Sequence, residues 1–280
     1  MIRTILAPVS GSAADGPVLS AAARTAHAFG AHVYAVYPRF DPAAVAKTAG
    51  EKHPQGIIAD LVDQLGRAAH ARAAEAKVSA AEICARERLP LVAGSAPPPS
   101  ALWRIVPDDP GRLAACGMTA DLIVAPRPDG DDPRSRWTFN TLLFDTGRPV
   151  LMPIGAPGGD LFRHVSVAWK PTPQAARALA FALPLLARAA AVTVLTVEET
   201  EDQPGDLDSV VAYLGEHGIK AEGQHLPGKG GAAAAVLRAA EDASLIVMGA
   251  YGRSRIGEWV FGGFTRSLIH ESPVPLLMAH

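Results

Sequence analysis

Glycines near the end of the chain are spaced as in loops that bind phosphate groups. Gly249 and Gly252 follow a short apolar run, and Gly262 and Gly263 come ten residues further on, before a stretch typical of a helix. Glycine tolerates positive φ and lets a ligand approach the backbone, so that successive N–H groups can point at phosphate oxygens. A helix N-terminus adds the positive end of its dipole. The spacing therefore predicts an anion site between residues 249 and 265.

Side chains around these glycines favour the same chemistry. The hydroxyl of Thr265 can donate to a phosphate, and Arg253 and Arg255 place positive charge beside the loop. Lys170 follows the first apolar run of the second half, and Trp169 next to it could form one wall for a flat ring. The plainer interpretations are a flexible loop with tight turns, a solvated surface lysine and a packing tryptophan, and the sequence leaves them open.

Residue patterns for catalysis or metal binding do not occur around this loop. The sequence has no Gly-x-Ser-x-Gly elbow, no Lys-Ser/Thr pair closing a Walker loop and no carboxylate pair beside the glycines. Four histidines of the second half are scattered, and Cys84 and Cys116 lack the spacing of metal ligands. We therefore predict neither catalytic nor metal-binding residues, with a weak ATPase left as an alternative.

Strand-like and helix-like segments alternate, and the pattern starts twice. Each half opens with an apolar run, a turn, an Ala-rich helix and a second apolar run, and each closes with two short apolar runs. The matching runs are 4–9 and 165–169, 31–37 and 191–197, 120–125 and 243–248, and 148–152 and 274–278. This order predicts an α/β fold of two tandem doubly wound, Rossmann-like domains, each with a five-stranded, mostly parallel sheet.

Domain limits follow from composition. The Gly/Pro-rich segment 155–159 predicts a linker between domains 1–155 and 160–280. The first half also carries a Pro-containing stretch at 38–60 and a long amphipathic helix over 60–88. For that helix we expect a buried face formed by Leu61, Leu65, Ala68 and Ala69.

The glycine spacing resembles that of the universal stress protein (UspA-like) family, whose nucleotide-binding members carry Gly-x2-Gly-x9-Gly-(Ser/Thr). Gly249, Gly252 and Gly262 fit this pattern, and Gly263 stands where the family has Ser or Thr. The whole chain looks like a tandem pair of such domains, adenine nucleotide alpha hydrolase-like in fold. The resemblance implies a stress-response regulator that binds ATP or another adenine nucleotide, which Mg²⁺ can accompany. The implied contacts are Gly249, Gly252, Arg253, Gly262, Gly263, Phe264, Thr265, Ala168, Lys170 and Val197.

The family's usual aspartate at the end of the first strand is missing from both halves. Ser10 takes its place in the first half and Lys170 in the second. At the place of the phosphate loop, the first half has the segment 127–133 with two prolines and three aspartates, then Asn140 and Thr141 leading into the last helix. Prolines lack N–H donors and aspartates repel phosphate. We therefore predict a degenerate first domain and one nucleotide per chain.

Bulk composition limits the partners. Hydrophobic residues make up 49% and charged residues 19% of the chain, and the formal net charge is −2. Such values are typical of a globular protein and give no footprint for nucleic acid. No apolar run is long enough for a membrane span, and we expect the cytoplasm as location. The resemblance implies an intramolecular pseudo-dimer through the two closing strands and leaves open a homodimer or a purely structural protein without nucleotide.

Overall fold

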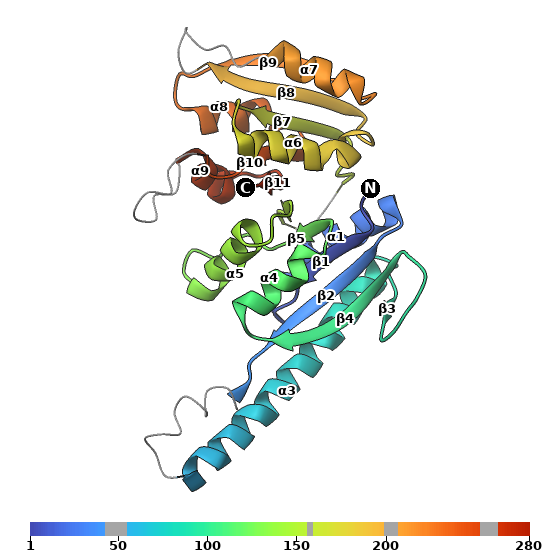
Figure 1. Ribbon diagram of the computed structural model, residues 1–280, viewed down its shortest axis with the longest axis vertical. Coiled ribbons are helices and arrows are strands. Elements are labelled where there is room, and N and C mark those ends of the chain that lie inside the picture. Colours follow the sequence, from blue (N-terminus) through green and yellow to red (C-terminus); the bar gives the residue numbers. More distant parts are fainter. Residues whose placement is uncertain (43–54, 156–158, 199–206, 253–262) are drawn as a thin grey trace. The chain divides into compact units, whose positions relative to one another are not determined.

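Two compact units make up the structure, a computed structural model that describes residues 1–42, 55–155, 159–198, 207–252 and 263–280. The N-terminal unit comprises Ile2–Pro126 and the C-terminal unit Arg127–His280. Figure 1 labels the helices and strands of both units. The domain limits predicted from composition, 1–155 and 160–280, stay a prediction.

A parallel sheet of five strands forms the centre of the N-terminal unit. Its order is β3-β4-β2-β1-β5, and the printed sequence supplies the apolar runs that form β1, β2 and β5. The strands are β1 (Thr4–Pro8), β2 (His32–Arg39), β3 (Leu91–Val92), β4 (Ser100–Pro107) and β5 (Leu122–Val124). The described helices are α1 (Asp15–Phe29), α3 (Gln55–Arg86) and α4 (Pro110–Met118).

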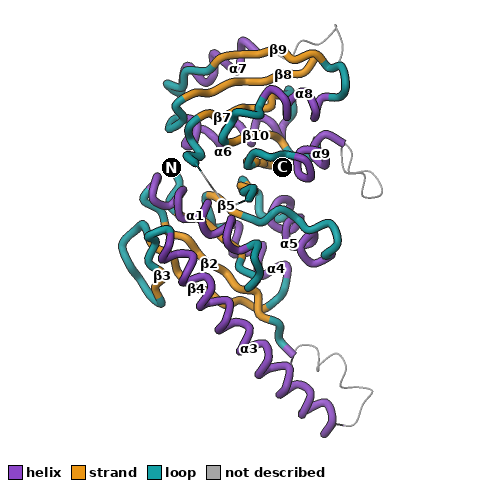
Figure 2. The backbone as a smooth tube through the Cα atoms, turned by 180° about the vertical axis from the view of Figure 1, so that it is seen from behind, coloured by secondary structure: helices purple, strands orange, loops and turns teal. Residues whose placement is uncertain are grey.

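Small residues control the packing of α3. Its buried positions include Ala69, Ala73, Ala76 and Ala80, which allow a close approach to neighbouring backbone, and α3 contacts both α1 and β2. The predicted buried face is wrong for three of its four residues. Leu61 is 53% exposed, Leu65 is 37% exposed and Ala68 is exposed too, whereas Ala69 is buried as expected. In both views this end of the helix extends beyond the strands of its own unit (Figure 2), so periodicity alone overstates burial there.

Six strands of the C-terminal unit lie in the order β6-β11-β10-β7-β8-β9. Its strands are β6 (Val150–Met152), β7 (His164–Trp169), β8 (Ala191–Glu198), β9 (Glu222–Pro227), β10 (Leu245–Gly249) and β11 (Leu276–Ala279). Its described helices are α5 (Pro133–Phe144), α6 (Pro173–Leu186), α7 (Leu207–Glu216), α8 (Ala232–Ala239) and α9 (Gly263–Glu271). All pairs are parallel except β6 with β11, where Leu151 lies opposite Leu277. The predicted pairing of the two closing strands is thus confirmed.

Both units repeat one doubly wound topology. The first strand lies between the second strand and the strand near the end, as β2-β1-β5 in one unit and β8-β7-β10 in the other. The predicted α/β fold with tandem sheets is confirmed. In the C-terminal unit the strand order changes direction between the neighbouring strands β7 and β10. In doubly wound sheets, ligands usually bind at the carboxyl ends of the two strands on either side of this point. In the described ranges, no helix is long and apolar enough to cross a membrane.

The two cysteines differ in accessibility. Cys84 on α3 is 1% exposed, and burial raises the pKa of its thiol to about 11, whereas Cys116 on α4 is half-buried. Because the thiolate is the reactive form, we expect Cys116 to react with a disulfide reagent such as DTNB in the folded protein well before Cys84 does. Cys84→Ser and Cys116→Ser variants assign the fast phase. A fast phase that survives in Cys116→Ser would contradict this expectation.

Candidate functional site

The carboxyl ends of β7 and β10 define the candidate site in the C-terminal unit. The two strands are neighbours, with Met248 opposite Ala168. Ala168 is buried in the sheet, and Lys170, just past the end of β7, is exposed. Val197 lies near the end of β8 and is half-buried. The topology therefore brings the expected strand-end residues of this unit to one edge of the sheet.

Gly249 allows a close contact between the end of β10 and the start of α6. A Cβ atom on this residue would lie 2.5 Å from the backbone N of Ala175 and 2.7 Å from the carbonyl carbon of Gln174, both at the start of α6. Neither neighbour is a flexible side-chain end, so neither can move aside. Only glycine lets the end of β10 pack against the N-terminal turn of α6.

The turn after β10 is held by hydrogen bonds at both of its first residues. Ala250 N–H donates to the Ala279 carbonyl over 2.8 Å, and Tyr251 N–H donates to the Thr265 hydroxyl over 3.2 Å. Thr265 is 4% exposed, so its side chain links the turn to the first turn of α9. A buried threonine therefore fixes the position of the turn relative to the helix.

The left-handed residue of this turn is Tyr251, with φ 55°. We expected positive φ at the glycines, and this is wrong for Gly249, Gly252 and Gly263, none of which lies in the left-handed region. Such a conformation is uncommon for a bulky residue and persists only when its surroundings hold it. Here the hydrogen bond to Thr265 and the ring contact with Phe144, at 5.1 Å between centroids, supply that constraint.

Gly252 combines exposure with open surroundings. A Cβ atom there would meet nothing closer than Gln174 Oε1 and Thr172 Cγ2, each at 3.8 Å. Thr172 is the N-cap of α6, and its hydroxyl accepts a hydrogen bond from Ala175 N–H over 3.2 Å. The backbone of Gly252 is therefore open to a ligand, without a steric need for glycine in the fold itself.

Several of the expected contacts lie in or next to residues 253–262, which the structure does not describe. Arg253, Arg255 and Gly262 fall outside the described residues. The predicted helix start is found, because α9 begins at Gly263, which is exposed, and Phe264 beside it is half-buried. Thr265 points its oxygen to the turn, as described above. The arrangement of the remaining loop atoms around a phosphate stays a prediction.

Trp169 carries an orphaned polar atom beside the site. Its indole Nε1 is buried and finds no hydrogen-bond partner within the described part of the chain. The backbone around it is ordered, since Trp169 C=O accepts from the Thr196 hydroxyl at 3.0 Å and Lys170 C=O accepts from Thr172 N–H at 2.7 Å. A buried donor without a partner is costly, and a bound polar ligand at this edge offers an acceptor. The edge of the sheet at the end of β7 thus has one buried donor without a partner among the described residues, and no carboxylate directly follows β7.

An aromatic cluster supports the turn from the other side. Phe144 of α5 lies against Tyr251 and against His280, with ring centroids 5.1 and 4.9 Å apart. His280 Nδ1 is 3.1 Å from the Ala250 carbonyl. Burial raises the pKa of the Tyr251 phenol to about 12, so it stays protonated at neutral pH. Sequence reasoning did not find this cluster, because its members are far apart along the chain.

Arg127 holds the opposite end of α9. Its guanidinium donates to the carbonyls of His270 and Ser272, which lie at the C-terminus of that helix. A cation at this end complements the helix dipole. Burial lowers the pKa of Arg127, and its Nε has no partner in the described ranges. We had assigned Arg127 only to a degenerate loop, whereas it steadies the helix that carries Thr265.

The turn after β1, which corresponds to the turn after β7 in the C-terminal unit, is occupied by the chain's own carboxylate. Asp15, 3% exposed, accepts hydrogen bonds from Ser10 N–H and the Ser10 hydroxyl at 2.9 Å and from Gly11 N–H at 2.7 Å. Ala76 of α3 covers the same turn, because a Cβ on Gly11 would lie 3.3 Å from the Ala76 Cβ. Sequence reasoning missed Asp15. The donors that could receive an anion after β1 are therefore already satisfied.

The aspartates of segment 127–133 also serve the chain itself. Asp132 is the N-cap of α5 and accepts from Arg134 N–H at 2.9 Å, and Asp129 accepts from Asp131 N–H at 3.0 Å. We expected Asn140 and Thr141 to lead into this helix, which is wrong, because α5 already begins at Pro133. Proline at the first position and an aspartate cap fix the helix start earlier.

No group of three or more His, Cys, Asp or Glu side chains that could hold a metal ion occurs among the described residues. The candidate site is therefore one of backbone donors, a hydroxyl and aromatic surface.

Comparisons with known proteins agree with this fold. The sequence profile of the Universal stress protein family matches residues 198–280, which include the glycine-rich segment. A universal stress protein from Archaeoglobus fulgidus DSM 4304 has a TM-score of 0.70 at 18% identity, covering 99% of this chain and 95% of that one. A protein from Pseudomonas aeruginosa UCBPP-PA14 with the same family description has a TM-score of 0.54 at 15% identity, covering 99% and 93%. The resemblance to this family is thereby confirmed.

A universal stress protein in complex with cAMP is also similar to part of the chain. It covers 43% of this chain and 99% of its own, with a TM-score of 0.35 at 16% identity. No curated protein matches the sequence.

Proposed function

We propose that this chain, built on the universal stress protein fold, is a cytoplasmic regulator that binds one adenine nucleotide, with ATP as the first candidate. The nucleotide binds in the C-terminal unit, where β7 and β10 end. The observation that carries the proposal is the turn after β10, with exposed Gly252 at the winding switch of the sheet and Thr265 at the start of α9.

The phosphates contact the glycine-rich segment from Gly249 to Thr265, close to Gly252 and to the N-terminus of α9. Backbone N–H groups and a helix N-terminus suit an anion without any metal or catalytic side chain. The ring system lies toward the ends of β7 and β8, near Ala168, Lys170 and Val197. There the buried Nε1 of Trp169 has no hydrogen-bond partner among the described residues, and it can donate to an acceptor atom of the ring system. Arg253, Gly262, Gly263 and Phe264 complete the proposed set.

The proposal limits binding to one nucleotide per chain. At the place of the phosphate loop, the segment after β5 carries Asp129, Asp131 and Asp132, which would repel a phosphate. After β1, Asp15 already occupies the donors of Ser10 and Gly11. Two negative charges about 5 Å apart repel each other by roughly 3 kcal/mol at an effective dielectric near 20. We therefore expect isothermal titration of the intact chain with ATP to give a stoichiometry near one. A value near two would contradict the assignment of an empty N-terminal unit.

Gly252→Val tests the loop directly. The fold tolerates the added side chain, because a Cβ there has its nearest neighbours at 3.8 Å, but the valine covers the backbone that the phosphates approach. We expect the Kd for ATP to rise at least about tenfold, or 1.4 kcal/mol. The matched control is Gly130→Val, at an exposed glycine with nothing within 4 Å of its Cβ position, which should leave the Kd unchanged.

Three outcomes separate the alternatives. An unchanged Kd in a folded Gly252→Val protein contradicts the loop assignment, and equal losses in both valine variants point to an indirect effect. Titrations with ATP, ADP, AMP and cAMP that all release no heat, together with no thermal shift, contradict nucleotide binding and favour a purely structural role.

A further inference from the structure

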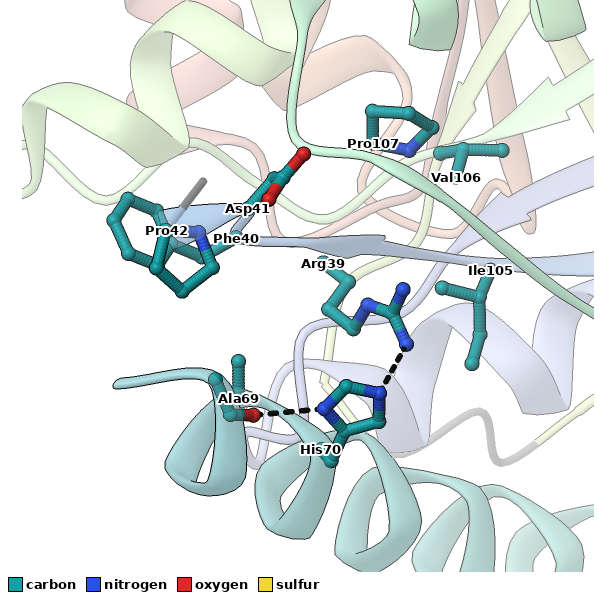
Figure 3. A pocket seen from close by; sticks show the side chains of 10 residues that line it. Arg39, Phe40, Asp41, Pro42, Ala69, His70, Ile105, Val106 and Pro107 are labelled. Atoms are coloured by element: carbon teal, nitrogen blue, oxygen red, sulfur yellow. Dashed lines mark hydrogen bonds between the residues drawn. The ribbon is translucent and has the colours of Figure 1, made fainter. Parts of the chain in front are cut away.

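A pocket of about 150 Å³ lies in the N-terminal unit. It opens where β2 and β4 end side by side, with Arg39 paired to Pro107, and α3 closes the other side through Ala69 and His70. Figure 3 shows the Arg39 side chain running from its strand toward His70 on the helix. The nucleotide assignment does not involve these residues.

The guanidinium of Arg39 is oriented by a short relay of hydrogen bonds. His70 Nδ1 lies 2.8 Å from the Gly66 carbonyl, which requires a proton on Nδ1. His70 Nε2 is then an acceptor, and Arg39 Nη1 donates to it over 3.1 Å. The helix thereby fixes the direction of the guanidinium plane, and among the described residues the remaining side-chain N–H groups of Arg39 form no further hydrogen bond. In the described ranges, Arg39 forms no salt bridge with a carboxylate.

The rest of the pocket is mainly apolar. Ile105 is 44% exposed there, and Ala69, Val106 and the ring of Phe40 add further apolar surface. Asp41 lines the same pocket, and in Figure 3 its carboxylate points away from Arg39. The pocket thus joins one oriented cation to apolar walls beside one anion.

We propose that this pocket binds a small organic monocarboxylate with an apolar body, whose carboxylate is held by the Arg39 guanidinium. The planar fork of arginine matches a carboxylate through two parallel hydrogen bonds. The size agrees, because a cavity of about 150 Å³ accepts a single benzene-sized ring. Covering Ile105 removes apolar surface from water and adds to the affinity.

Benzoate is the probe for this site. Titration of the intact ¹⁵N-labelled chain, followed by amide shifts, should show saturable changes at Arg39, His70 and Ile105 with a Kd in the millimolar range or below. Benzyl alcohol, which lacks the charge, and inorganic phosphate, which lacks the apolar body, should bind more weakly. Shifts that do not saturate, or that map to other residues, would overturn the proposal.

Arg39→Gln tests the role of the guanidinium and should raise the benzoate Kd at least about fivefold. The matched control is Arg104→Gln, which removes the same charge from β4, where Arg104 lies 3.9 Å over the Tyr34 ring and does not line the pocket. If both variants lose the same affinity for benzoate, the effect comes from the net charge of the protein and the assignment to Arg39 is overturned. If Arg39→Gln does not fold, His70→Ala serves instead, because it keeps the guanidinium but removes the hydrogen bond that orients it. An unchanged benzoate Kd in His70→Ala would contradict the role of this hydrogen bond.

Discussion

Gly249→Ala is expected to destabilise the C-terminal unit by about 3 kcal/mol, even though it adds a single methyl group. The new Cβ would lie 2.5 Å from Ala175 N, which is shorter than the van der Waals contact between a carbon and a nitrogen atom that are not bonded to each other. Because the obstacle is the backbone of α6, the helix or the strand must move. For a unit of this size the melting temperature should fall by roughly 10 °C.

The matched control for this variant is Gly215→Ala in α7, where nothing lies within 4 Å of the Cβ position. There alanine removes the entropic cost of a helical glycine, and we expect a gain of about 0.5–1 kcal/mol. Calorimetric melting of the intact chain compares both variants. If Gly249→Ala has the same melting temperature as the wild type, the packing role is contradicted. The glycine would then be needed only for ligand binding.

Asp15→Ala is expected to cost about 2–3 kcal/mol in the N-terminal unit. The change leaves the two N–H groups of Ser10 and Gly11 and the Ser10 hydroxyl without their carboxylate. Ser10 and Gly11 are exposed and these bonds are part-buried, but hydrogen bonds to a charged group contribute about 1.5–3 kcal/mol. Asp109→Ala removes an exposed N-cap that accepts one bond, from Arg112 N–H, and should cost only about 1 kcal/mol. Equal losses in chemical denaturation would contradict the special role of Asp15.

The same carboxylate makes stability depend on pH. Burial raises the pKa of Asp15 above its ordinary 3.8, and the hydrogen bonds from Ser10 and Gly11 offset part of this shift. The folded chain therefore holds the proton more strongly than the unfolded chain, and this contribution to stability is full below pH 3.8 and is lost as the pH rises through the folded value. Relative to Asp15→Asn, which does not titrate, the wild type should lose stability over that interval. A difference that stays constant with pH would contradict the shift.

The repeated strand and helix order could be predicted from the sequence because parallel strands covered on both faces leave short apolar runs between helical periods. The same reasoning could not decide what Gly249 serves, since a glycine needed by a ligand and one needed by a helix look alike in sequence. Leu61 was misplaced for a related reason, because periodicity shows a face but not where the covering surface ends.

Residues that act across long separations were harder to find. Asp15 had a local signal, a carboxylate placed shortly after a Ser-Gly-Ser turn, and such a residue can bond the turn's N–H groups. Arg39 and His70 had none, because their contact depends on the angle between β2 and α3. The aromatic cluster around Tyr251 likewise exists only after α5 and the last residue of the chain come together.

The place of β11 in its sheet has a consequence for folding during synthesis. β11 is the last strand of the chain, yet it lies between β10 and β6, and Leu277 pairs with Leu151, well over a hundred residues earlier. Until β11 has left the ribosome, β6 and β10 each lack this partner and expose an unpaired edge. The sheet of the C-terminal unit therefore closes only after β11 has been synthesised, and a nascent chain that stalls before β11 presents two open strand edges to chaperones.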